Sequence, residues 1–349
     1  MTTLRPPVTI PIAAVHGMLS GIRARASESP AWVETLLDEA GIASALMEQT
    51  GARVTSVQYA ALFRLLMDRL DDEGLGFLSR RLRRGSFTLM ARSALGSPSI
   101  EVALCRVAQS FRLLQDDVEM VRLRDGPLIG IGLEFSNMAV ARQNFLHELV
   151  LRVSWRLLDW LHGSPLVPSG FDFGFDMPPY VAAYTKIFPG PLQFGQPHSA
   201  VWFKGTELAA PVRRDERALQ AFLRVAPGNV IEPRLNEQTF SARVRTLLQQ
   251  ACPAWPDLAT AAQALHQSSS TLQRHLAIEG TTFQSLKDQL RRDMAIVRLN
   301  TSAVPMGVLA EELGFAGSAA FQRAFKTWTG SAPGSYRQHG DPGDTESAD

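Results

Sequence analysis

The stretch LAEELGFAGSAAFQRAFKTWTG, residues 309–330, decides how the last third of this 349-residue chain folds. Apolar residues recur at three- and four-residue spacing on both sides of Gly314, which is typical of two short helices. Glycine readily adopts the positive φ that ends a helix, so Gly314 marks the turn between them. Phe321 and Phe325 would then face inward, with polar side chains opposite them. The stretch predicts a helix-turn-helix unit whose second helix spans Ser318–Trp328.

The same pattern occurs once before it. Residues 258–265 carry apolar side chains at helical spacing, and residues 266–268 are short and polar, as a turn requires. A serine at the end of this turn can cap the next helix by accepting hydrogen bonds from its free amide groups. Leu272 and Leu276 would hold that helix, Ser269–Ile278, against a core. Two such units in succession arise by chance far less often than one.

Charge and composition divide the rest of this region. Residues 227–237 contain Pro227 and Pro233, which break regular structure, so they are expected to form a linker. Residues 236–337 carry ten Lys and Arg against seven Asp and Glu, a locally basic balance. The charged residues of 338–349 are all acidic, and we expect a disordered acidic tail there. The outline is an all-α domain over residues 238–337.

Residues 238–337 resemble the DNA-binding domain of the AraC/XylS family of bacterial transcriptional regulators. The resemblance rests on SSSTLQR at 268–274, LAEELGF at 309–315, SAAFQRAFKTWTG at 318–330 and PGSYR at 333–337. It implies that one long helix, expected over Phe283–Asn300, joins the two units. Both second helices would then act as recognition helices in adjacent major-groove segments, about one turn or roughly 34 Å apart.

The resemblance also implies a set of DNA contacts. The positions expected to contact base edges are Ser270, Gln273, Arg274, Ser318, Ala319, Gln322 and Arg323. Arginine can pair with guanine, glutamine with adenine, and alanine can offer only apolar contact. The expected phosphate contacts, which position the protein without selecting a sequence, are Arg291, Arg292, Lys326 and Arg337.

The front of the chain, residues 1–226, predicts an α+β domain. Helical spacing is found in residues 12–26, 30–40, 55–70, 100–114 and 142–160. Short β-leaning runs occupy residues 118–124, 128–135, 171–176 and 200–203. The sequence Asp-Gly-Pro at 125–127 separates the first two runs and indicates a hairpin.

Residues 10–225 resemble the "arabinose-binding" N-terminal domain of a subgroup of AraC-like regulators. The matching stretches are 74–77, 85–87, 171–173, 184–190 and 192–195. The resemblance implies effector sensing, dimerisation or both, without implying a sugar. The candidate effector-pocket residues are aromatic side chains that can stack on a small organic molecule: Phe173, Phe175, Tyr180, Tyr184, Phe194 and Trp202. Their alternative role is ordinary core packing.

A basic run adds a second possibility. The segment RRLRR at 80–84 can hold an anionic effector or the DNA backbone, or form a solvated helix end. Of these roles, the sequence favours the solvated helix end.

Enzymatic function is not expected. The chain has neither a Gly-x-Ser-x-Gly elbow nor a His-Glu-x-x-His pair, and Gly130-Ile131-Gly132 lacks a third glycine. Only two cysteines occur, Cys105 and Cys252, and the apolar spacing around Cys105 predicts that it is buried. We expect no cofactor and no metal. Because the two cysteines are far apart and support no disulfide framework, we expect a protein of the reduced cytoplasm, and no segment reaches the roughly 18 apolar residues of a membrane span.

Together these features predict a homodimeric, effector-responsive transcriptional activator that binds double-stranded DNA and a small-molecule effector, with RNA polymerase as a further partner. Two alternatives remain at this stage. One is a DNA-modifying enzyme that uses the helix-turn-helix region for targeting and a reactive cysteine for catalysis. The other is a partner-binding protein that has lost DNA binding.

Overall fold

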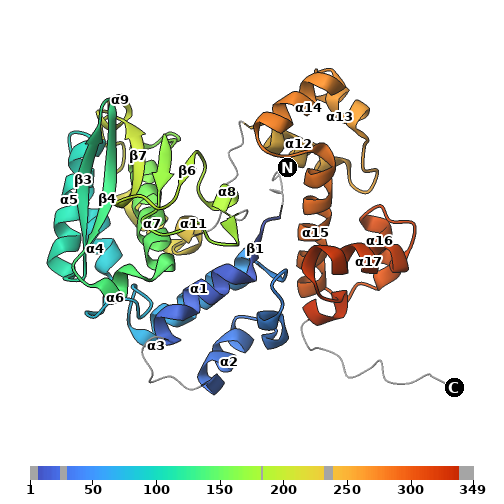
Figure 1. Ribbon diagram of the computed structural model, residues 1–349, viewed down its shortest axis with the longest axis horizontal. Helices are drawn as coiled ribbons and strands as arrows, with labels where there is room; N and C mark the ends of the chain where they lie inside the picture. Colours follow the sequence, from blue (N-terminus) through green and yellow to red (C-terminus); the bar gives the residue numbers. More distant parts are fainter. Residues whose placement is uncertain (1–6, 24–29, 182–183, 232–238, 338–349) are drawn as a thin grey trace. The chain divides into compact units, whose positions relative to one another are not determined.

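The computed structural model describes residues 7–23, 30–181, 184–231 and 239–337 (Figure 1). Contacts within the chain divide it into two compact units. The C-terminal unit comprises Met1–Ile12, Leu37–Gln58 and Leu235–Asp349, and the front unit comprises Ala13–Leu36 and Tyr59–Arg234. This division differs from the expected one, because two segments from the beginning of the chain pack with the C-terminal helices. The expected tail, 338–349, lies outside the described residues.

The front unit is built on a five-stranded sheet with strand order β3-β4-β7-β5-β6. Its strands are β3 (Val118–Asp125), β4 (Leu128–Phe135), β5 (Gly170–Asp172), β6 (Leu192–Gln193) and β7 (Ser199–Lys204). All pairs are antiparallel except β5–β6, and the expected hairpin is present, with Val118 opposite Phe135. The expected strand over 171–176 ends at Asp172, and beyond it the Gly174 amide donates to the side-chain hydroxyl of Ser199 in β7, 2.8 Å away, instead of to a main-chain carbonyl.

Helices surround this sheet or extend from it. The helices of this part of the chain are α1 (Ile12–Arg23), α2 (Pro30–Glu39), α3 (Ser56–Leu70), α4 (Ser86–Ala94), α5 (Ile100–Leu114), α6 (Met138–Ala141), α7 (Asn144–His162), α8 (Tyr184–Ile187), α9 (Gly205–Leu208), α10 (Glu216–Arg224) and α11 (Gly228–Ile231). Helices α5 and α7 pack against the strands (Figure 1). The division between the units falls inside α2 and α3, whose first or last residues belong to the C-terminal unit.

Helix α11 corrects part of the linker prediction. Residues 228–231 were expected to be irregular, but they form a helical turn that contacts α7. Its Val230 and Ile231 are 3% and 2% exposed, so burial of two branched apolar side chains stabilises the turn. The remaining linker residues, 232–237, lie outside the described residues.

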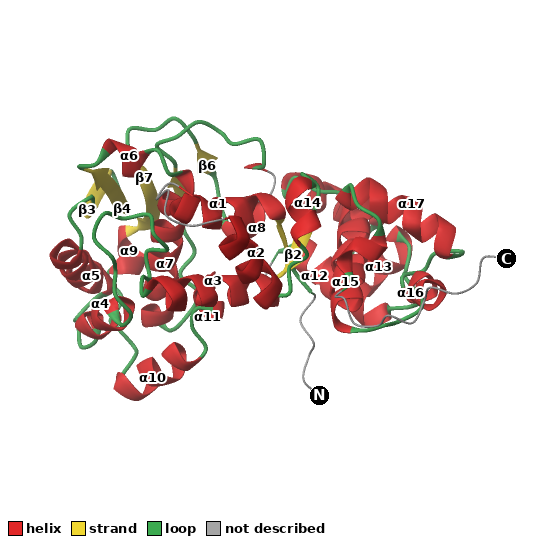
Figure 2. Ribbon diagram, turned by 90° about the horizontal axis from the view of Figure 1, so that it is seen from below, coloured by secondary structure: helices red, strands yellow, loops and turns green. Residues whose placement is uncertain are grey.

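The C-terminal unit is helical apart from one short strand pair, as far as its residues are described (Figure 2). Its elements are β1 (Thr9–Pro11), η1 (Ser44–Glu48), β2 (Arg53–Thr55), α12 (Phe240–Ala251), α13 (Leu258–Ala264), α14 (Ser269–Ile278), α15 (Phe283–Thr301), α16 (Met306–Glu312), α17 (Ser318–Thr329) and η3 (Pro333–Tyr336). Helix α15 runs from the group α12–α14 to the group α16–α17 (Figure 1). Among the helices of the described residues, none has the length and apolar character that crossing a bilayer requires.

A buried carboxylate ties the first strand to the long helix. Asp293 of α15 is fully buried and accepts a hydrogen bond from the Thr9 hydroxyl at 2.6 Å. It also pairs with the guanidinium groups of Arg245 at 3.1 Å and Arg292 at 3.0 Å. A buried charge is tolerated only when it is paired and hydrogen-bonded. The β1–β2 pair is therefore part of the hydrophobic and polar core of the C-terminal unit.

Candidate nucleic-acid interface

The first helix-turn-helix unit consists of α13 and α14. The Ser268 hydroxyl caps α14 by accepting a hydrogen bond from the Thr271 amide at 3.1 Å. Leu272 and Leu276 are fully buried, as their spacing predicts. Three expected base-contacting side chains are exposed on the opposite side of the helix, namely those of Ser270, Gln273 and Arg274.

The second unit consists of α16 and α17. Gly314 has a φ of 72° in the turn, and Phe321 and Phe325 are fully buried. Helix α17 begins after Gly317 without a side-chain cap. The expected base contacts Ala319, Gln322 and Arg323 are exposed, and Ser318 is partly exposed.

Both recognition helices present surfaces suited to DNA. Neither α14 nor α17 contains an acidic residue, whereas each contains one arginine, and α17 adds Lys326. Lys326 is exposed, and among the described residues its ammonium group has no ion-pair partner. Uncharged polar and cationic side chains are the types that contact base edges and phosphates.

Arg291 of α15, expected to contact a phosphate, has its guanidinium group packed against aromatic rings of the protein. Its guanidinium lies 4.9 Å from the ring centroid of Trp255 and 5.0 Å from that of Phe315. It also donates to the Gly314 carbonyl at 3.3 Å, and its burial lowers its pKa. The indole of Trp255 donates to the Glu312 carbonyl at 3.1 Å. Arg291 thus connects the loop after α12 to the turn of the second unit.

The other two expected phosphate arginines also hold protein partners. Arg292 is paired with Asp293, and Arg337 donates to the Val304 carbonyl. Only Lys326 of the four is directed to solvent without such a partner in the described part of the chain. An arginine so engaged must exchange its protein partner before it can bind a phosphate.

The second unit is supported by the beginning of the chain. The Arg53 amide donates to the Tyr336 hydroxyl at 3.1 Å, and burial beside other guanidinium groups lowers the pKa of Arg53 to about 10. At Gly51 an added Cβ would lie 2.9 Å from the Thr329 carbonyl. The main chain around Gly51 therefore packs directly on the end of α17.

In the front unit, five of the six predicted pocket aromatics gather in one cluster. Ring centroids of Phe173 lie 5.3 Å from Tyr184 and 5.1 Å from Phe194. Phe175 and Tyr180 complete the cluster at 5.2 Å from Phe173 and 6.0 Å from Tyr184. The rings pack directly against one another, as side chains do in a hydrophobic core.

Trp202 stands apart from this cluster. Its indole donates to the Asp172 carboxylate at 2.6 Å, and its ring covers Gly130, where an added Cβ would lie only 2.7 Å away. That contact explains why a glycine occupies the middle of β4. Gly130, one of the two glycines that resemble a fragment of a phosphate-binding loop, therefore serves packing.

A buried carboxyl borders the aromatic cluster. Glu148 of α7 accepts a hydrogen bond from the Tyr184 hydroxyl, and burial raises the pKa of Glu148 to about 7. Its neighbour His147 bonds to the Ser199 hydroxyl and the Ala141 carbonyl, and burial lowers its pKa. Both nitrogens of the imidazole are thus occupied, which gives His147 a packing role.

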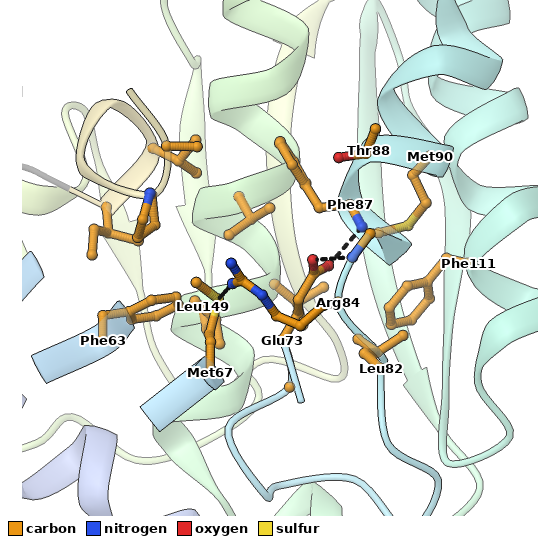
Figure 3. A pocket seen from close by; sticks show the side chains of 18 of the residues that line it. Phe63, Met67, Glu73, Leu82, Arg84, Phe87, Thr88, Met90, Phe111 and Leu149 are labelled. Carbon is orange, nitrogen blue, oxygen red and sulfur yellow. Dashed lines mark hydrogen bonds between the residues drawn. The ribbon is translucent and has the colours of Figure 1, made fainter. Parts of the chain in front are cut away.

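A cavity of about 500 Å³ opens elsewhere in the front unit (Figure 3). Its walls come from α3, α4, α5, α7, α10, α11, the strand β3 and the segment 73–85. None of the six predicted aromatics lines it. The opposite face of α7, with Leu146, Leu149, Val150 and Val153, forms one wall.

Sequence patterns gave a partial signal for this cavity. Gly74, Gly85 and Phe87 lie in stretches that carry the resemblance, and Leu82 and Arg84 lie in the basic run. Periodicity shows which side of a helix is buried, but it does not show whether the buried side meets a neighbour or an open space. The cavity residues on α3, α5 and α7 were therefore indistinguishable from ordinary core.

These observations define a class of protein: a DNA-binding regulator with two helix-turn-helix units and a separate front unit that holds a cavity. The family described as the arabinose-binding domain of AraC transcription regulators, N-terminal, matches residues 32–212, and a helix-turn-helix domain family matches residues 261–339. The chain belongs to the family of AraC transcription regulators, and it is a DNA-binding regulator of transcription.

Similar proteins carry related names. The ornithine utilization regulator of Pseudomonas aeruginosa is 25% identical over 306 residues, which cover 87% of this chain and 90% of that protein. The transcriptional regulator VqsM of the same organism is 33% identical over 95 residues, 27% of this chain and 29% of VqsM. The crystal structure of the regulator CdpR from Pseudomonas aeruginosa matches 95% of this chain and 99% of its own, with 19% identity and a TM-score of 0.32.

The matched family consists of transcription regulators and not of enzymes. One expectation about the cysteines was wrong, because Cys105 is exposed. The buried side of α5 is formed by Ile100, Ala103, Leu104, Val107 and Phe111, and Cys105 falls on the other side. Within the described ranges, no group of three or more His, Cys, Asp or Glu side chains is placed to hold a metal ion.

Proposed function

We propose that this chain acts as a homodimeric, effector-responsive transcriptional activator that inserts α14 and α17 into adjacent major-groove segments of one operator half-site. Dimerisation of the front units would double the DNA contacts, which raises the effective concentration at a two-half-site operator. An activator of this kind works at a promoter together with RNA polymerase, in the cytoplasm where bacterial DNA lies. The protein contributes binding alone and no catalytic step.

One observation carries the DNA-binding part of this proposal. Both recognition helices belong to the same compact unit, each buries one apolar side, and each exposes a cationic and polar side. Helix α15 joins them, and the Arg291 contacts with Trp255 and Phe315 hold the second turn against the first part of the unit. A fixed join favours simultaneous insertion, because less freedom is lost on binding.

The exposed side chains suggest distinct roles. Arg274 and Arg323 would pair with guanines, and Gln273 and Gln322 with adenines, each contributing about 1–3 kcal/mol of discrimination. Ser270, Ser318 and Ala319 would make the remaining base contacts. Lys326 is the phosphate contact that its exposure favours, and Arg291, Arg292 and Arg337 would contribute after exchanging their present partners.

Footprinting on the region upstream of the chain's own gene tests the central claim. We expect two protected half-sites, and in each half-site two protected major-groove segments about one helical turn apart. Arg323→Ala should lose preference at a few base pairs and bind other sequences as before, whereas Lys326→Ala should weaken binding to every sequence alike. If both variants bind all probes as the parent does, the contact assignment is wrong.

Salt dependence gives an independent check. If six to ten phosphates are engaged, affinity should fall by about 10³ to 10⁵ between roughly 50 and 200 mM salt. A nearly flat dependence would favour the alternative of a partner-binding protein without DNA affinity.

The effector is proposed to bind in the cavity and not within the aromatic cluster, whose rings already fill their own space. The name of the Pseudomonas aeruginosa relative makes L-ornithine one candidate to examine. A ligand present at 100 times its dissociation constant should stabilise the front unit by about 2.7 kcal/mol, which a thermal-shift measurement detects.

A further inference from the structure

The interior of the front-unit cavity is mainly apolar. Figure 3 shows side chains from several elements directed toward the open space, with Met67 and Phe63 on one side and Met90 and Phe111 on the other. Its volume of about 500 Å³ lies within the roughly 300–1,000 Å³ usual for small-molecule sites. Three methionines line it, Met67, Met90 and Met120, and methionine adapts its shape to a flexible apolar ligand. This lining favours a molecule with an apolar body.

The charged groups at the cavity favour an anion. Two guanidinium groups line it, from Arg64 on α3 and from Arg84 on the segment before α4. Both side chains belong to exposed residues, and in the described part of the chain Arg64 has no hydrogen-bond or ion-pair partner. Two cations beside an apolar space attract one negative group.

The single carboxylate of the lining is already occupied. Glu73 accepts hydrogen bonds from the main-chain amides of Gly85 at 2.7 Å and Phe87 at 2.6 Å, drawn as dashed lines in Figure 3. Both of its oxygens therefore serve the loop that leads into α4. An organic ammonium ligand would need a free carboxylate in the lining. Glu73 is poorly placed to serve as one, because its oxygens already accept these hydrogen bonds.

Arg84 is held by weak partners. One nitrogen of its guanidinium lies 3.5 Å from the Met67 sulfur, and another lies 3.3 Å from an Asp68 carboxylate oxygen. Sulfur is a weak acceptor, and the pair with Asp68 is exposed, so it contributes at most about 1 kcal/mol. A ligand carboxylate in the partly desolvated cavity can displace both partners and form a bidentate pair.

We propose that the cavity binds a small amphipathic carboxylate. Its apolar body occupies the space among Met67, Met90, Phe111 and Leu149, and its carboxylate pairs with Arg84, with Arg64 as the second cation. This deepens the effector part of the proposed function by naming the ligand class. It also gives a role to two residues of the basic run at 80–84, because Leu82 and Arg84 line the cavity.

The ligand would touch segments that continue into the C-terminal unit. Helix α3 supplies Phe63, Arg64 and Met67, and its residues up to Gln58 belong to that unit. Helix α11 supplies Val230 and Ile231, and the chain enters the C-terminal unit again at Leu235. Occupancy of the cavity therefore acts on two of the chain segments that pass between the units.

Calorimetry on the full chain tests the proposal with saturated straight-chain carboxylates from hexanoate to dodecanoate, below their micelle concentrations. At least one carboxylate should bind, whereas the alcohol and the amine of the same chain length should bind at least about tenfold more weakly, because a charge-assisted pair contributes about 1.5 kcal/mol or more. Equal binding of all three head groups, preferential binding of the amine, or no binding by any carboxylate would overturn it.

Two variants locate the site. Arg84→Gln should weaken the carboxylate about tenfold or more and leave the alcohol unchanged, and Arg81→Gln, an exposed neighbour outside the lining, is the matched control. Met90→Trp should fill the space and abolish binding, with circular dichroism as the check on folding. Carboxylate affinity that survives both Arg84→Gln and a folded Met90→Trp contradicts the proposal.

L-Ornithine is the contrasting probe. Its two charged amino groups and short body fit the apolar lining poorly. We therefore expect it to bind at least about tenfold more weakly than the best carboxylate, a difference of about 1.4 kcal/mol in binding free energy, which the loss of one favourable contact can produce. Tighter binding of ornithine that Met90→Trp removes would identify the cavity but refute the ligand class. Footprinting of the unliganded chain tests the DNA function separately, so the two proposals fail independently.

Discussion

The two helix-turn-helix units reach the same shape by different means. The first unit has a local side-chain cap and an anchor to the preceding helix: Ser268 caps α14, and the Glu279 carboxylate just after α14 accepts hydrogen bonds from the amides of Phe240 and Ser241 at the start of α12. The second unit lacks a side-chain cap on α17 and is held by distant residues such as Trp255 and Arg53. A shared motif therefore does not imply a shared source of stability.

The largest loss of stability should come from removing the Asp293 carboxylate of α15, the helix that joins the two helix-turn-helix units. Asp293→Ala removes the partner of Arg245 and Arg292 and leaves buried positive charge without compensation, at a cost of about 3–5 kcal/mol in the free energy of unfolding. Urea denaturation of the full chain measures it, with Asp288→Ala on the same helix as the control. A loss below about 1 kcal/mol would contradict the role of Asp293 as common support.

The glycines that end helices in the two units offer a matched comparison. Gly280 and Gly314 have φ of 69° and 72°, but an added Cβ meets nothing within 4 Å at Gly280 and lies 2.6 Å from the Trp255 ring at Gly314. Gly280→Ala should cost about 1 kcal/mol from backbone strain, and Gly314→Ala about 2–4 kcal/mol because the ring must also move. Equal losses in urea denaturation would show that Trp255 does not support the second turn.

Removal of Arg291 separates its structural role from a phosphate contact. Arg291→Ala loses two cation–π contacts and should cost about 1–2 kcal/mol of stability, whereas Arg243→Ala, which loses one contact with Phe240, should cost about 0.5–1 kcal/mol. If Arg291 only supports the fold, the salt dependence of DNA binding stays unchanged. A decrease of about one in the salt slope would identify it as a phosphate contact as well.

The smallest effects concern the helix caps. Ser268→Ala should destabilise the first unit by about 1 kcal/mol, because the Thr271 amide loses its acceptor. Alanine at the corresponding position before α17, Gly317→Ala, should alter the free energy of unfolding by less than about 0.5 kcal/mol. No side-chain cap is lost there, and an added Cβ meets nothing within 4 Å. Thermal unfolding measures both, and equal effects would remove the distinction between the units.

The same contrast explains what could be predicted from the sequence. Helix α14 begins and ends at the predicted residues, because its serine cap and its leucine spacing are local signals. The strands β1 and β2 were missed, since three residues each are too few for an alternating pattern. Their anchor, the bond from Thr9 to Asp293, joins positions 284 residues apart, which no local pattern reveals.

The candidate sites divide in the same way. The outward side chains of the recognition helices follow from helical periodicity once the inward leucines and phenylalanines are known. The cavity depends on several stretches, far apart in the sequence, that leave a common space unfilled, which is a property of the assembled fold. Aromatic content suggested a pocket at Phe173 and Tyr184, but these rings pack on each other and are 0% and 1% exposed.

The bond between Thr9 and Asp293 also bears on how the protein is made. A ribosome that adds about 5–20 residues per second needs roughly a quarter of a minute to a minute to pass from the first of these residues to the second. During that interval β1 has emerged but its acceptor does not yet exist. The Thr9 hydroxyl therefore lacks this acceptor until residue 293 has been added, whereas the main chain of β1 can pair with β2 as soon as residues 53–55 have been made.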